Sequence, residues 1–112
     1  MSFSDHRPET ERERRDRETN ELKEFLKLSH WLLAEGPRLR RGEITEESLR
    51  PLAHQVNHAM WDAEKTINCR YWRDVYNTRP KTDSLRQLLD EVLIMKARIK
   101  KPIRTVLDSA CM

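Results

Sequence analysis

The chain has 112 residues, of which 37% are apolar and 37% are charged, and only two are glycine. A chain of this length forms a single domain, and its scarcity of glycine and β-branched residues predicts an all-α fold. No apolar run is longer than five residues, so we expect neither a membrane span nor a signal peptide.

Charges of opposite sign are separated along the chain. Between Ser4 and Glu21, five basic and seven acidic residues give a net charge of −2, whereas between Lys65 and Arg104 eleven basic and four acidic residues give +7. A polyanionic partner is therefore expected to bind the second half of the chain.

The first segment, residues 1–19, is predicted to be a charged arm, because residues 4–21 contain no apolar side chain that could line a core. Two alternatives stay open: a solvated helix supported by i,i+4 pairs of glutamate and arginine, or a disordered segment. Apolar residues then recur at helical spacing and predict a first packed helix over Asn20–Glu35. Gly36 and Pro37 are expected to end this helix.

The stretch from Thr45 to Asn77 is predicted to be the central helix, with Thr45 or Ser48 as its N-cap. One face carries an apolar core stripe, and the opposite side is also bulky. Such a helix is expected to have neighbours on two sides. The core stripe consists of Leu49, Leu52, Ala53, Val56, Met60, Ala63, Ile67 and Tyr71, and the second stripe of His54, Trp61 and Trp72, with His58, Lys65 and Tyr76 beside it.

A third helix is predicted over Ser84–Lys101, where Ser84 and Gln87 have the spacing of a capping box. Pro102 is expected to end or kink it. Residues 20–107 then form a helical domain, and residues 108–112 a loose tail. The predicted fold is all-α, either a long-helix hairpin or a three-helix bundle. We expect a homodimer, because the second stripe of the central helix needs a partner.

Basic residues at the end of the central helix, in the following loop and along the third helix give the strongest indication of a polyanion site. Such residues can follow the phosphate backbone of RNA or DNA without reading its sequence. The competing interpretation is solvated charge that keeps the protein soluble. The candidate nucleic-acid-binding residues are Arg70, Arg73, Arg79, Lys81, Arg86, Lys96, Lys100, Lys101 and Arg104.

The second stripe of the central helix suggests an interface with a partner, because Trp and Tyr dominate such surfaces. Core packing and base stacking are the alternatives for its aromatic residues. Two of its histidines have the i,i+4 spacing of metal ligands, but no Cys/His cluster supplies further ligands. We therefore expect no metal and no other cofactor. The candidate interface residues are His54, His58, Trp61, Trp72 and Tyr76.

Enzyme motifs are missing from the sequence: it has no nucleophile elbow, glycine-rich phosphate loop or paired-carboxylate motif. We therefore expect a small accessory or regulatory protein that is not an enzyme. It binds either nucleic acid through its basic second half or, as a helical adaptor, a protein partner through its Trp/His face. No membrane partner is expected. Cys69 and Cys111 form no disulfide framework, which favours an intracellular location, cytoplasmic or, in a eukaryotic or viral host, nuclear.

Overall fold

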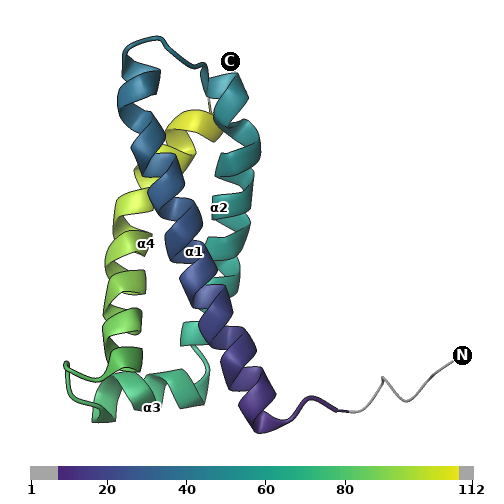
Figure 1. Ribbon diagram of the computed structural model, residues 1–112, viewed down its shortest axis with the longest axis vertical. Helices are drawn as coiled ribbons and strands as arrows, with labels where there is room; N and C mark the ends of the chain where they lie inside the picture. Colours follow the sequence, from purple (N-terminus) through teal and green to yellow (C-terminus); the bar gives the residue numbers. More distant parts are fainter. Residues whose placement is uncertain (1–7, 109–112) are drawn as a thin grey trace, which may run out of the picture.

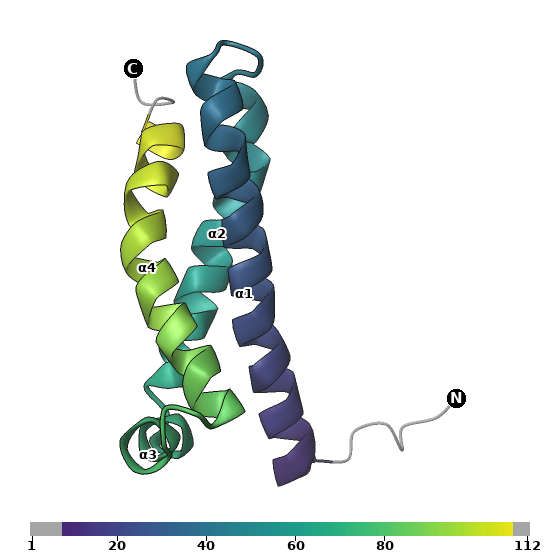
Figure 2. The same cartoon turned by 60° about the vertical axis from the view of Figure 1, so that its left-hand side comes forward.

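The computed structural model describes residues 8–108. This range contains four helices and no strand: α1 (Glu11–Arg40), α2 (Glu46–Ile67), α3 (Arg70–Thr78) and α4 (Ser84–Asp108). The all-α prediction is confirmed. The three long helices pack side by side in alternating directions, and the short α3 lies across one end of the bundle (Figures 1 and 2). None of these helices combines the length and apolarity needed to cross a bilayer.

The core lies along the centre of the three-helix bundle. Most of the predicted apolar stripe of α2 is buried in it, together with leucine and phenylalanine from α1 and aliphatic residues from α4. Burial of this continuous apolar surface is the main stabilising contribution in a helical fold of this kind. The largest fully buried side chains are Trp72, Phe25, Leu22, Leu89 and Ile99.

The first helix is longer at both ends than the sequence predicted. A complete capping box between Thr10 and Glu13 starts α1 at Glu11, so the predicted boundary between arm and domain falls inside this helix. The prediction that the charged segment is solvated is wrong at Glu18. That carboxylate is buried and accepts a hydrogen bond of 2.9 Å from the indole Nε1 of Trp72.

The Gly36–Pro37 pair does not end α1, contrary to the prediction. An internal proline removes one backbone hydrogen bond and crowds the carbonyl four residues earlier. Packing of Leu39 in the added turn against the core offsets this cost. The helix ends instead at a Schellman motif, in which Gly42 adopts a φ of 76° and the amide of Glu43 donates to the carbonyl of Arg38. This backbone conformation favours glycine.

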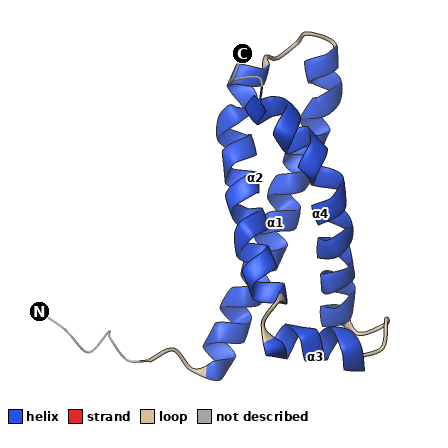
Figure 3. Cartoon of the chain, turned by 180° about the vertical axis from the view of Figure 1, so that it is seen from behind, coloured by secondary structure: helices blue, strands red, loops and turns tan. Residues whose placement is uncertain are grey.

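The predicted central helix is two helices. Thr45 is its N-cap, as one alternative predicted, but α2 ends at Ile67, and Asn68 and Cys69 connect it to α3. Asn and Cys are weak helix formers, and the break turns α3 across the end of the bundle (Figure 3). Trp72, which lies off the core stripe of a continuous helix, is buried as a result.

The third predicted helix corresponds to α4 and also differs at both ends. Asp83, rather than a Ser84–Gln87 capping box, caps it: the carboxylate accepts hydrogen bonds from the amides of Leu85 (2.9 Å) and Arg86 (3.2 Å). The helix continues through Pro102 to Asp108, because aliphatic residues beyond the proline are buried in the core. Apart from Asp108, the predicted tail lies outside the described residues.

Candidate nucleic-acid interface

Three of the nine predicted cations are engaged in contacts within the fold. Arg86 is the clearest case: its side chain donates to the carbonyl of Tyr76 (2.6 Å), stacks on the Tyr76 ring (4.1 Å to the centroid) and pairs with Asp90 (3.2 Å). Arg86 therefore holds α3 against α4 and is poorly placed for a ligand. Lys96 pairs with Glu64 of α2 and Arg79 pairs with Asp83.

The other six predicted cations form no ion pair with a carboxylate of residues 8–108. They separate into two groups that lie near opposite ends of α4. Between Arg86 and Arg104 the axial rise is roughly 27 Å, at 1.5 Å per residue. One group lies on α3 and the following loop, and the other on the last turns of α4. The first group is Arg70, Arg73 and Lys81, and the second is Lys100, Lys101 and Arg104.

Two cations of the second group, Lys100 and Arg104, line a depression between α2 and α4. This depression has a volume of about 280 Å³, and Asn57, Lys100 and Arg104 contribute to its lining. Asp108 also lines it, but its carboxylate lies more than 4.0 Å from both cations. The cations therefore keep their charge available to an incoming anion.

Trp61 lies on α2 one turn after Asn57 and is not among the residues that line the depression. It is four residues from Asn57 and three from Glu64, so it shares their helix face. Asn57 lines the depression with Lys100, while Glu64 pairs with Lys96. Along the axis of α2, Trp61 lies between the levels of Asn57 and Glu64, and it is 56% exposed. Trp61 is thus an exposed aromatic residue on the helix that faces Lys100 and Arg104 across the depression.

The remaining predicted interface residues have different positions. Trp72 is 1% exposed, so its assignment to a partner surface is wrong: its indole donates to Glu18 and meets Tyr71 edge-on, with centroids 5.2 Å apart. His54 and His58 are exposed on α2, and Nδ1 of His58 is 3.4 Å from the carboxylate of Asp62. Tyr76 is partly covered by Arg86.

A further cation of α4, Arg98, is not among the residues predicted from the sequence. Arg98 is exposed and has no carboxylate partner among the residues that the structure describes. The sequence contains a pattern that would have identified Arg98: residues 92–107 include five basic residues and no acidic residue. The cationic half of α4 therefore comprises Lys96, Arg98, Lys100, Lys101 and Arg104.

No group of three metal-ligating side chains lies within the described range. Comparison with protein-family models, curated proteins and solved structures gives no match to this chain.

Proposed function

We propose that this protein is a small accessory protein that binds the phosphate backbone of nucleic acid without reading its sequence. The binding surface is the cationic half of α4 together with Trp61. The observation that carries the proposal is the depression between α2 and α4, which Lys100 and Arg104 line without a carboxylate partner among the described residues. The exposed Trp61 lies one turn along α2 from Asn57, which lines the same depression. Cations contact phosphates, and an exposed aromatic ring stacks on a base of any identity.

The competing explanation for the same cations is a structural role. Positive charge in the last turn of a helix is favourable because it lies at the negative end of the helix dipole, but α4 has no basic residue in its last turn. That role alone would favour cations close to the C-terminus. It does not account for Trp61, whose large apolar surface is left in water. Trp61 therefore favours a ligand that both stacks and carries negative charge.

The first prediction concerns the salt dependence of binding. Labelled duplex DNA and single-stranded DNA of equal length are titrated with the protein over a salt series, with fluorescence anisotropy as the readout. Replacing Lys100, Lys101 and Arg104 with Gln should flatten the log–log slope on duplex DNA by about 0.9 for each lost contact, or about 2.7 in total. The loss of affinity should be similar for unrelated sequences.

A matched control removes three charges elsewhere. The variant Arg12→Gln/Arg14→Gln/Lys23→Gln makes the same change in net charge at three exposed positions of α1, and it should keep most of the slope. Trp61→Ala should weaken single-strand binding more than duplex binding, because only unpaired bases are free to stack. The proposal fails if wild-type protein retains neither nucleic acid at low salt, or if the two triple variants behave alike.

A second candidate function is supported by a separate observation. His54, His58 and Trp61 recur at i, i+4 and i+7 on α2, and all three are exposed. This face suits an adaptor that docks a protein partner or a second copy of the chain. Light scattering on the same samples distinguishes the two functions. A wild-type dimer that Trp61→Glu converts to a monomer, without any nucleic-acid retention, would favour the adaptor.

A further inference from the structure

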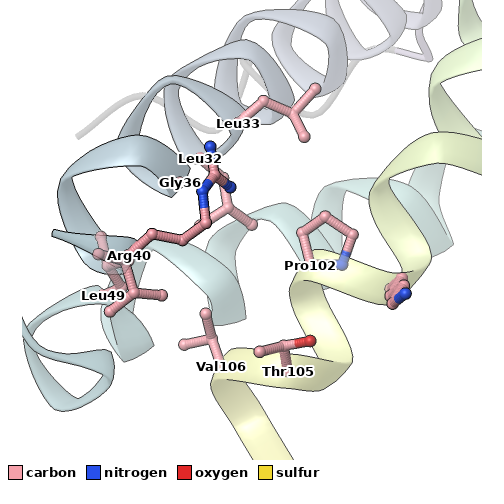
Figure 4. A pocket seen from close by; sticks show the side chains of 10 residues that line it. Leu32, Leu33, Gly36, Arg40, Leu49, Pro102, Thr105 and Val106 are labelled. Atoms are coloured by element: carbon pink, nitrogen blue, oxygen red, sulfur yellow. The ribbon is translucent and has the colours of Figure 1, made fainter.

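A second concave surface lies at the end of the bundle opposite α3. It is a groove of about 290 Å³ between the last turns of α1, the first turns of α2 and the last turns of α4 (Figure 4). Most of its wall is aliphatic, and its polar atoms come from two cations and one hydroxyl group. The lining residues that carry the argument are Leu33, Gly36, Arg40, Lys101, Pro102 and Thr105.

Two residues that usually disturb helices build this groove. Gly36 lies inside α1 with no Cβ to occupy the space, and its backbone does not need the left-handed conformation, which only Gly42 adopts among the glycines. Pro102 lies inside α4 on the opposite wall. An internal proline kinks a helix, and α4 changes direction in its last turns (Figures 1 and 3).

The charges around the groove are unequally neutralised. Arg38 pairs with Glu35 and with Glu43, and Arg41 also pairs with Glu43. Arg40 and Lys101 have no such partner within residues 8–108. Figure 4 shows the side chain of Arg40 extending along the groove, with its guanidinium group next to Gly36. A cation from α1 and another from α4 therefore border an apolar space.

We propose that this groove binds a small amphipathic carboxylate, a fatty acid of medium chain length. Its aliphatic tail lies along the leucine and proline walls, and its carboxylate pairs with Arg40, whose planar guanidinium matches two carboxylate oxygens. Lys101 and the Thr105 hydroxyl lie at the same groove as further donors. A cavity of about 150 Å³ admits benzene, so this groove has room for roughly a dozen carbon atoms.

Isothermal titration calorimetry with sodium decanoate, below its micelle concentration, tests the inference on the full chain. Wild-type protein should bind one decanoate. Arg40→Gln should weaken binding about tenfold or more, because a charged hydrogen-bond partner is lost. Gly36→Leu should abolish binding by placing a side chain in the groove. This variant should also fold, since leucine is a better helix former than glycine.

Matched controls keep the site intact. Ala34→Leu adds the same bulk at an exposed position of α1, and Arg98→Gln removes an exposed cation one turn before Lys101; both should bind decanoate like the wild type. Decanol has the aliphatic tail but no carboxylate, and inorganic phosphate is an anion without a tail. Each should bind at least tenfold more weakly than decanoate. The inference is overturned if decanoate does not bind, if decanol binds equally well, or if Gly36→Leu still binds.

Of the three cations replaced in the DNA experiment, only Lys101 also lines this groove. Arg40 and Gly36, on which the decanoate test depends, lie on α1 and are not part of the proposed nucleic-acid interface. Arg40→Gln should therefore leave the salt slope on duplex DNA nearly unchanged. If the protein binds no decanoate, the proposed nucleic-acid binding is unaffected, and if it binds no nucleic acid, the decanoate inference is unaffected.

Discussion

Ser29 is a fully buried residue on α1 whose hydroxyl has no hydrogen-bond partner among the described residues. A buried polar group without a partner destabilises the folded state, and serine is a weaker helix former than alanine. We therefore expect Ser29→Ala to raise the free energy of unfolding by about 1 kcal/mol. Urea denaturation measures the change, and His30→Ala, at the exposed neighbouring position, serves as a control for helix propensity alone. An unchanged or lower stability would contradict the prediction.

Glu18 illustrates the opposite case, a buried charged group that has partners. Its carboxylate accepts hydrogen bonds from the Trp72 indole (2.9 Å) and from Arg15 (2.8 Å), and the guanidinium of Arg15 lies over the Tyr71 ring. Both bonds reach the same oxygen, Oε1. Burial of a carboxylate is less costly when it accepts hydrogen bonds, especially from a cation. The composition of the charged segment could not reveal the contact with Trp72, because Trp72 lies 54 residues away in the sequence.

At the scale of the helix, the N-terminus of α4 depends on the ionised state of Asp83. Partial desolvation of its carboxyl group opposes ionisation, but the amides of Arg86 and Leu85 and the charge of Arg79 together lower the pKa of Asp83 below its ordinary value. A lowered pKa in the folded state means that the stabilisation is fully present above the unfolded pKa of about 3.9. It is lost as the pH falls through the lower, folded value.

This pH dependence can be measured with a conservative substitution. Asn is also a good N-cap but does not titrate, so Asp83→Asn should flatten the loss of stability below about pH 4 while keeping the helix. Thermal melts of wild type and variant over a series of acidic buffers give the comparison. Parallel curves for the two proteins would show that Asp83 is not a source of the acid sensitivity.

The helical elements were predictable where apolar periodicity is continuous, and their ends were not. The stripe from Leu49 to Ala63 identified α2, because a single face is buried over its whole length. The break at Asn68 and Cys69 escaped prediction, because burial of Trp72 favours it and only the fold shows that burial. Gly36 and Pro37 were mistaken for a terminus because the apolar contact of Leu39 after them is tertiary.

For the molecule as a whole, the charge asymmetry was readable from the sequence but the candidate site was only partly so. Sequence position identified the cations of α4 because they occupy one helix without acidic neighbours. It could not identify ion pairs between helices, such as Lys96 with Glu64, or the stacking of Arg86 on Tyr76. These contacts depend on how α2, α3 and α4 are placed relative to one another, which periodicity does not encode.

The placement of the three tryptophans determines what an optical unfolding experiment reports. Trp31 and Trp61 are 54% and 56% exposed, so their emission should change little on unfolding, whereas Trp72 is 1% exposed. Intrinsic fluorescence therefore follows the contact of α3 with α1, while far-ultraviolet circular dichroism follows all four helices.

Because α3 buries only Trp72 and Val75, we expect α3 to detach from the bundle before the three long helices unfold. The urea midpoint by fluorescence should then be lower than the midpoint by dichroism. Coincident midpoints would instead indicate one cooperative unit, and Trp72→Phe should remove most of the fluorescence change.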